Sequence, residues 1–187
     1  MSSDIGLFGL AVMGQNLALN IAEKGFSISV HNRSPQKVED TVKRSEKEGN
    51  GKFQLTGYKD MESFIKSLKK PRRVILLVQA GPAVDSTIEL MMKYLEKDDA
   101  IIDGGNEFYV NTERRQEECL KKGILYLGMG VSGGEEGARQ GPSLMPGGNK
   151  DVYDSIEHIL IKIAAQLKDD GPCVTYIGPG GAGNYVK

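Results

Sequence analysis

The chain has 187 residues, 39% of them hydrophobic, and this length is enough for one well-buried globular core. Its 24 basic and 25 acidic residues give a formal net charge of −1, which supplies no broad field for nucleic acid or for an anionic membrane surface. The longest strongly apolar run, residues 74–78, falls far short of a transmembrane helix, and the first residues lack the basic and apolar regions of a signal peptide. We therefore expect a cytoplasmic protein with no nucleic-acid or membrane partner.

Cysteine and histidine are too sparse for a disulfide framework or a metal centre. Cys119 and Cys173 have no C-x-x-C spacing, and His31 and His158 stand alone in the sequence. No metal site is expected from such a pattern.

Strand-like and helix-like segments alternate along the chain. Short apolar or period-two runs predict strands over residues 4–9, 26–30, 72–80, 100–105, 124–132 and 173–178. Helical spacing and end signals predict helices over residues 13–24, 34–47, 60–70, 83–95, 112–122 and 151–167. This alternation predicts an α/β fold: a Rossmann-type, doubly wound, mostly parallel sheet with helices on both faces.

Residues 133–150 break the alternation, because they contain six glycines and two prolines. Within them, the sequence SLMPGG at residues 143–148 is typical of a strand end. We expect a functional loop here rather than a disordered linker.

A glycine motif lies between the first predicted strand and helix. Gly9, Ala11 and Gly14 are spaced as in G-x-G-x-x-G, with alanine in the middle position. Gly9 would form the tight turn, Gly14 would let the helix pack closely on the strand, and the amides of Val12, Met13 and Gly14 would face a pyrophosphate. The Ala11 methyl implies a slightly displaced phosphate. A turn whose glycines serve geometry alone is the alternative.

The sequence HNRS at the end of the second predicted strand bears on the choice of cofactor. An NAD-binding protein usually has an acidic residue here, whereas Asn32 is neutral and Arg33 can bind a phosphate with two N–H groups. Ser34 can donate a hydrogen bond or cap the next helix. This pattern favours NADP over NAD; the alternative is that Arg33 is a solvated charge and Ser34 only a cap.

Six segments together resemble one family: GLAVMGQN, NRS, DGGNEFY, GVSGGEEGAR, PSLMPGG and GPGGAGNYVK. They are similar to the N-terminal, coenzyme-binding part of the 6-phosphogluconate dehydrogenases, and the resemblance covers essentially the whole chain. It implies that NADP lies over residues 9–14 with Met13 against the nicotinamide, that residues 32–34 hold the 2′-phosphate, and that Val78, Gln79 and Ala80 also line the cofactor site.

The resemblance also implies a substrate site and a base. Asn106 would reach both the cofactor and 6-phosphogluconate, while Ser132, Gly133 and Gly134 would hold the sugar acid. Lys187 matches the general base of the family, which oxidises the substrate at C3 and then releases CO2, with no metal. Lysine suits this role where burial or nearby positive charge lowers its pKa.

The resemblance implies a division of the chain as well. Residues 1–178 would form the NADP-binding domain, and residues 179–187 would begin the connection into an all-helical domain that this chain lacks. That domain would carry the general acid and build a homodimer. We accordingly expect Lys187 to be mobile, solvated and near its ordinary pKa.

Two positions depart from the family pattern: Gln79 stands where lysine is common, and Asn184 where many members have histidine. Two functional alternatives are another β-hydroxyacid dehydrogenase and a stand-alone dinucleotide-binding module.

Overall fold

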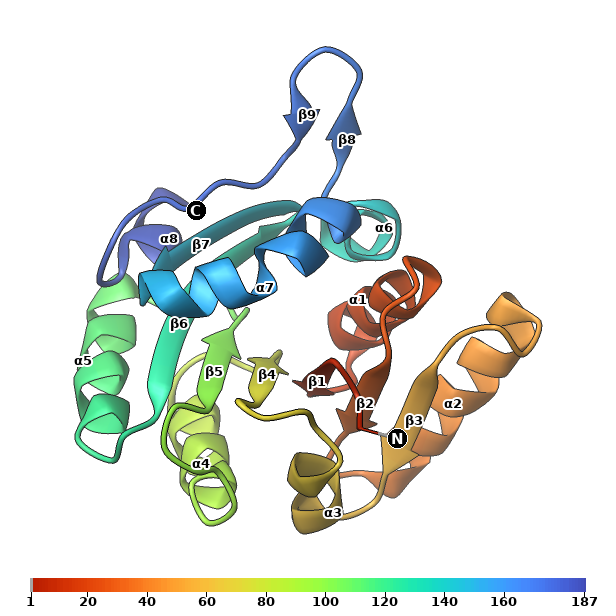
Figure 1. Ribbon diagram of the computed structural model, residues 1–187, viewed down its shortest axis with the longest axis horizontal. Helices are drawn as coiled ribbons and strands as arrows, with labels where there is room; N and C mark the ends of the chain where they lie inside the picture. Colours follow the sequence, from red (N-terminus) through yellow and green to blue (C-terminus); the bar gives the residue numbers. More distant parts are fainter. Residues whose placement is uncertain (1) are drawn as a thin grey trace.

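The computed structural model describes residues 2–187, in which a seven-stranded sheet carries helices on both faces (Figure 1). The strand order is β3-β2-β1-β4-β5-β6-β7; the first six strands are parallel, and β7 runs antiparallel to β6. The fold class predicted from the sequence is therefore confirmed. The strands of this sheet are β1 (Ile5–Phe8), β2 (Ile28–His31), β3 (Leu55–Tyr58), β4 (Arg73–Leu76), β5 (Ala100–Asp103), β6 (Leu125–Ser132) and β7 (Ser143–Gly148).

Eight helices are present in the described part of the chain. They are α1 (Val12–Glu23), α2 (Pro35–Gly49), α3 (Met61–Lys66), α4 (Pro82–Met91), α5 (Tyr109–Leu120), α6 (Gly134–Gln140), α7 (Lys150–Ile163) and α8 (Ala182–Val186). None of them is long and apolar enough to cross a membrane.

Two hydrophobic clusters, one on each face of the sheet, hold the helices in place. Alternation along β1 illustrates this arrangement, because Ile5 and Leu7 enter one cluster and Phe8 enters the other. Helices α1, α2 and α7 contribute to the first cluster, and α3, α4 and α5 contribute to the second. Every residue of β1, β2, β4 and β5 is buried, as expected for parallel strands that are covered on both sides.

The strand order reverses between β1 and β4. From β1 the chain winds outward through β2 and β3, and it then returns to place β4 on the other side of β1. Loops that leave β1 and β4 in opposite directions create a crevice at the carboxyl ends of the strands, where ligands bind in sheets of this type. The fold thus directs attention to the loops that follow β1, β2, β4 and β5.

Several element predictions were wrong. Strand β3 was not predicted, because LTGY is short, has no apolar run and forms a partly exposed edge. Residues 134–140 form helix α6 although their glycines favour a loop. The strand predicted over residues 173–178 is absent; that segment pairs with β7 only through the isolated bridges Leu144–Val174 and Gly147–Gly178.

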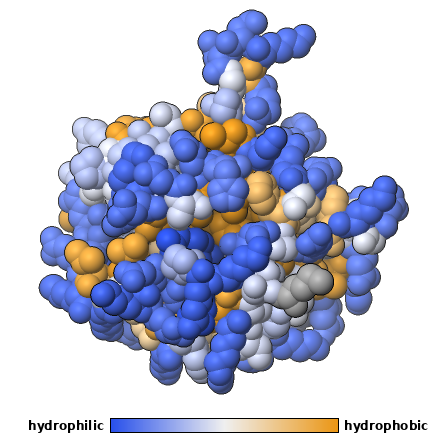
Figure 2. Space-filling model, in the orientation of Figure 1, coloured by the Kyte–Doolittle hydropathy of each residue, from blue (hydrophilic) through white to orange (hydrophobic). Residues whose placement is uncertain are grey.

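Helix α7 ends at Ile163 rather than at residue 167, because the chain turns into a small hairpin of β8 (Gln166–Leu167) and β9 (Gly171–Pro172). This hairpin projects from the body of the molecule (Figure 1), and its surface is mostly hydrophilic (Figure 2). The polar sequence of the segment explains why it does not continue the amphipathic helix.

Candidate functional site

The turn after β1 requires glycine at two positions. Gly9 has φ +104°, and a Cβ atom there would lie 2.1 Å from the carbonyl oxygen of Leu77. A Cβ atom on Gly14 would lie 1.8 Å from the carbonyl oxygen of Gly9. Both distances are impossible for a side chain, so Gly9 forms the tight turn and Gly14 lets α1 approach β1, the geometric roles expected from the sequence.

The N-terminus of α1 is uncapped and opens into a groove. Ala11 is the N-cap residue and provides no side-chain hydrogen bond, and the first turn contains no acidic side chain. The amides of Val12, Met13 and Gly14 therefore have neither an intrahelical acceptor nor a capping side chain. Such a helix end attracts an anion, because free N–H groups and the helix dipole act together.

Asn32 ties the end of β2 to this turn. Its Oδ1 accepts a hydrogen bond from the Leu10 amide at 3.0 Å, while Nδ2 donates to the Ser34 carbonyl oxygen at 3.4 Å. Sequence reasoning placed Asn32 at a phosphate. The contact that the structure shows is a different one, since this side chain fixes the glycine turn relative to the residues that follow β2.

Cationic and hydroxyl groups gather beside Asn32 in a hollow of about 290 Å³. Arg33 is exposed and forms no ion pair within residues 2–187. Ser34 is the N-cap residue of α2, yet its hydroxyl makes no capping bond. Lys37, one turn into α2, lines the same hollow and was missed in the sequence, although its position four residues after Arg33 was a usable signal.

A larger groove of about 670 Å³ continues from this hollow across the carboxyl ends of the strands. Ala11, Val78 and Gln79 line both spaces, so the two are joined around the β4 loop. The structure brings most of the predicted site residues together in this groove: Ala11, Val12, Met13, Gly14, Val78, Gln79, Asn106, Ser132, Gly133, Gly134 and Lys187. Ala80 is half-buried and does not line either space.

Asn106 lies on a turn that is held from inside the protein. The carboxylate of Asp103 accepts hydrogen bonds from the Gly105 amide at 2.9 Å and from the Tyr126 hydroxyl at 2.7 Å. Burial raises the pKa of Asp103, and these two hydrogen bonds oppose that rise only in part. The turn therefore presents the exposed Asn106 side chain to the groove on a rigid base.

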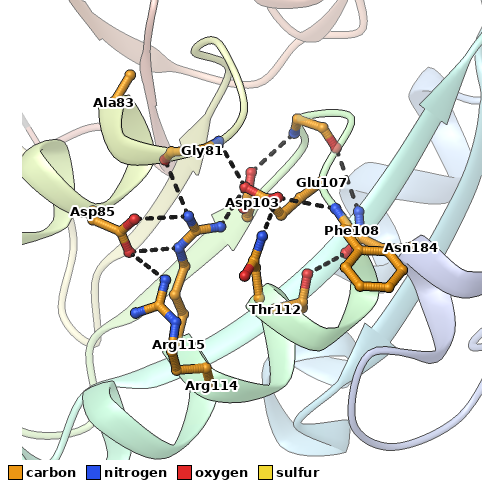
Figure 3. A network of polar contacts seen from close by, with 12 residues as sticks. Gly81, Ala83, Asp85, Asp103, Glu107, Phe108, Thr112, Arg114, Arg115 and Asn184 are labelled. Carbon is orange, nitrogen blue, oxygen red and sulfur yellow. Dashed lines mark hydrogen bonds and ion pairs between the residues drawn. The ribbon is translucent and has the colours of Figure 1, made fainter.

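Helix α8 reaches the groove across a surface of glycines. A Cβ atom on Gly128 would lie 2.4 Å from Asn184 Oδ1, and one on Gly183 would lie 2.3 Å from the carbonyl oxygen of Met145. Asn184 Oδ1 accepts a hydrogen bond from the Thr112 hydroxyl at 3.0 Å, and its Nδ2 donates to the Gly105 carbonyl oxygen at 3.4 Å (Figure 3). Asn184 thus connects α8 to both α5 and the Asn106 turn.

Lys187 directly follows α8, and its Nζ donates a hydrogen bond to Asn106 Oδ1. Desolvation by partial burial lowers the pKa of Lys187 below its usual range. Lys187 is exposed, as expected, but the expectation of an ordinary pKa was wrong, because glycines under α8 allow the side chain to settle against Asn106. A lowered pKa favours the neutral amine that a general base requires. None of the described residues form a cluster of His, Cys, Asp or Glu that could hold a metal ion.

A glycine turn at the switch point, a free helix N-terminus and a groove across the strand ends define a Rossmann-type dinucleotide-binding domain. Comparison with known families narrows this class. The sequence model for the NAD binding domain of 6-phosphogluconate dehydrogenase matches residues 4–178, and the chain belongs to that family.

Relatives and solved structures agree with this assignment. The chain is 66% identical to "6-phosphogluconate dehydrogenase, decarboxylating 1" of Spinacia oleracea over 98% of its own length and 37% of that relative. A solved 6-phosphogluconate dehydrogenase of Plasmodium falciparum, described as apo and in complex with NADP+ and with 6-phosphogluconate, superposes with a TM-score of 0.92 at 57% identity, over 98% of this chain and 38% of that one. A 3-hydroxyisobutyrate dehydrogenase of Mycobacterium tuberculosis shares the fold alone, with a TM-score of 0.80 at 18% identity over 100% of this chain and 58% of that one. The chain thus spans a little over a third of the length of these two 6-phosphogluconate dehydrogenases.

Proposed function

We propose that this chain is the NADP-binding unit of a decarboxylating 6-phosphogluconate dehydrogenase, which converts 6-phosphogluconate to ribulose 5-phosphate and forms NADPH. The observation that carries the proposal is the continuous groove, which leads from the cationic hollow at Arg33, past the free amides of α1, to Asn106 and Lys187. The names of the relatives support the reaction, and the solved Plasmodium falciparum structure supports both the cofactor and the substrate.

The residues of the groove fit NADP. Arg33 and Ser34, with Lys37 beside them, would hold the 2′-phosphate, and the amides of residues 12–14 would hold the pyrophosphate. The bound nicotinamide would supply an acceptor for the hydride that leaves C3 of the substrate. Met13, which lines the larger groove, would pack against that ring.

Asn106, Ser132, Gly133 and Gly134 would hold the sugar acid, because all four line the larger groove. Lys187 would take the proton from the 3-hydroxyl group and return it to the carbonyl oxygen during loss of CO2. Its hydrogen bond to Asn106 would keep Nζ at the end of the groove where the substrate hydroxyl lies.

Three further features belong to this proposal. Residues 1–178 would form the coenzyme domain, which agrees with the end of the family match at residue 178, and residues 179–187 would begin the connection to a helical domain. That domain would supply the general acid and the interface of a homodimer. A cytoplasmic location is our expectation, although chloroplastic enzymes are among the plant relatives.

The test is a calorimetric titration of the chain with NADP and with NAD, using two variants of Ala11. Ala11→Val should weaken NADP binding at least about tenfold, because a larger side chain would obstruct the pyrophosphate at its closest approach to the backbone. Ala11→Gly should bind NADP as the wild type does, and circular dichroism should show the same fold in all three proteins. Equal binding by the valine variant would reject this position for the cofactor.

The substrate is tested separately in the intact protein. We expect turnover with 6-phosphogluconate and not with 3-hydroxyisobutyrate. The opposite preference would assign the chain to another β-hydroxyacid dehydrogenase.

A further inference from the structure

Two of the loops that line the larger groove are joined beneath it by a buried ion pair (Figure 3). Glu107 directly follows Asn106, and Arg115 lies two turns further on, in α5. Their side chains are 4% and 1% exposed, respectively, and Arg115 Nη1 donates a hydrogen bond to Glu107 Oε2. Removing two charges from water is costly, and the cost is offset only when further hydrogen bonds satisfy both groups. The groups that supply those hydrogen bonds are therefore held in fixed positions around the pair.

Both side chains of the pair form hydrogen bonds with the backbone of Gly81, in the loop that follows β4. Glu107 Oε2 accepts a hydrogen bond from the Gly81 amide at 2.9 Å, and Arg115 Nη2 donates to the Gly81 carbonyl oxygen at 3.0 Å. Gly81 has φ +92° and comes two residues after Gln79, which lines the groove. The path of the β4 loop is thus fixed relative to Glu107, and therefore relative to Asn106.

Other donors and acceptors of the two side chains bind neighbouring groups as well. Arg115 donates from Nε and Nη2 to the two carboxylate oxygens of Asp85, at 2.8 and 2.9 Å, which anchors the first turn of α4. Glu107 Oε1 accepts from the Phe108 amide at 2.9 Å and from Asn111 Nδ2 at 3.0 Å. A planar guanidinium with several fixed donors can satisfy this geometry, whereas a lysine cannot.

A second buried ion pair lies at the opposite ends of β4 and β5 and can be compared with the Glu107–Arg115 pair. Arg72 and Asp99 precede β4 and β5, their side chains are 5% and 2% exposed, and Arg72 Nη1 lies 2.8 Å from Asp99 Oδ2. This pair lies at the amino ends of the strands, and neither residue lines the groove. The Arg72–Asp99 pair is therefore a control for a charge pair that is equally buried but lies away from the groove.

We propose that Glu107 and Arg115 are positioning residues, which set the loop that carries Val78 and Gln79 at a fixed distance from Asn106. They touch neither ligand themselves. The inference rests on the proposed function of the groove, because its consequence is the alignment of the coenzyme loop with the residue that reaches the substrate.

The test compares Glu107→Gln with the control Asp99→Asn in the same chain. Three measurements are made: the melting temperature, the side-chain amide NMR resonances of Asn106 and Gln79 without ligand, and NADP affinity by calorimetry. Glu107→Gln should shift both resonances and weaken NADP binding about three- to thirtyfold. Asp99→Asn should lower the melting temperature but leave the resonances and the affinity unchanged.

A Glu107→Gln protein that melts at a lower temperature, yet keeps both resonances and its NADP affinity, would overturn the proposal. If Glu107→Gln does not fold, Arg115→Lys gives the same comparison, because it retains the charge and loses the forked contacts. Failure of the wild type to bind NADP would reject the proposed function instead. The resonances of the unliganded chain would still decide whether the pair positions the loops.

Discussion

Asn32, Arg33 and Ser34 are neighbours in the chain, but their side chains have different tasks. Asn32 is engaged by the backbone of the glycine turn, while the Arg33 guanidinium and the Ser34 hydroxyl are free at the edge of the smaller hollow. The two free groups are the ones available to a phosphate. Discrimination between NADP and NAD should therefore depend mainly on Arg33, which can donate two hydrogen bonds, with Lys37 as a second positive charge in the same hollow.

Removal of the Arg33 charge gives the first prediction. Arg33→Ala should cost about 1.5–3 kcal/mol of NADP binding, the range for hydrogen bonds to a charged group, and should leave NAD binding nearly unchanged. Calorimetric titration with both cofactors measures the difference. Lys47→Ala, at the exposed far end of α2, is the control for loss of one positive charge. Equal losses for NADP and NAD in Arg33→Ala would show that this residue does not recognise the 2′-phosphate.

Among the helices that reach the site, α8 is short and depends on tertiary packing for its position. It has five residues, and it lies on a surface of β6 and β7 where glycines leave room for its backbone. A short helix has little intrinsic stability, so its position depends on this close packing. Lys187, the proposed base, contacts Asn106 only while α8 remains packed on β6 and β7.

Gly183→Ala should displace α8 from the surface of β6 and β7. The added methyl group would lie 2.3 Å from the Met145 carbonyl oxygen and 2.5 Å from that of Gly128, so α8 must move, at a cost of about 1–3 kcal/mol. Hydrogen exchange should show loss of protection confined to α8 and the Asn106 turn. Gly137→Ala in α6 is the control, since its methyl group would meet its nearest atom at 3.6 Å and should be neutral or stabilising by up to about 1 kcal/mol. Unchanged protection of α8 in Gly183→Ala would contradict this account.

The behaviour of the whole molecule in acid should depend on the network around Arg115. Burial by itself would raise the pKa of Glu107, but hydrogen bonds from Asn111, Gly81 and Arg115 outweigh it and lower that pKa to about 2. Hydrogen bonds from Arg115, followed by those from Arg114, lower the pKa of Asp85 to about 2 as well. A carboxyl group whose pKa is lowered by folding stabilises the folded state fully when the pH is above its ordinary pKa. This stabilisation is lost as the pH falls from the ordinary pKa through the lowered pKa of the folded state.

We therefore expect the melting temperature to fall steeply between about pH 4.5 and pH 2, the interval between the ordinary and the lowered pKa of Glu107. In Glu107→Gln, which cannot titrate at this position, the fall should be shallower from a lower starting value. Melting curves followed by circular dichroism across this range provide the measurement. Parallel curves for the two proteins would mean that Glu107 does not contribute to acid unfolding.

The charges that line the larger groove also limit the reaction that this chain can carry out by itself. Among the residues that line the larger groove, Lys187 is the one cationic side chain, whereas 6-phosphogluconate carries both a carboxylate and a phosphate group. Binding energy from remote parts of a substrate is needed to orient its reacting centre. The 187-residue chain should therefore bind NADP and form no NADPH from 6-phosphogluconate in a stopped assay at high protein concentration. Turnover above background by the purified chain would contradict this prediction.

Local signals in the sequence were sufficient for the architecture and for the glycine turn after β1. Alternating apolar runs and helix-end signals predict the parallel sheet, and the glycine spacing predicts the turn, because each of these features depends on residues close together in the chain. The edge strand β3 and helix α6 escaped such reasoning. Contacts from distant segments stabilise both: Gly57 in β3 packs under Val38 of α2, and Arg139 of α6 forms ion pairs with Glu23 and Glu48.

Contacts across the sheet could be decided only by tertiary structure. Glu107 and Gly81 are far apart in sequence, as are Asn106 and Lys187, and no spacing rule brings them together. Adjacent parallel strands do so, because β4 and β5 deliver their loops to one edge, and the glycines of β6 and β7 let α8 come close. The pKa of Lys187 follows from that approach, since burial depends on which atoms surround the amine and not on its place in the chain.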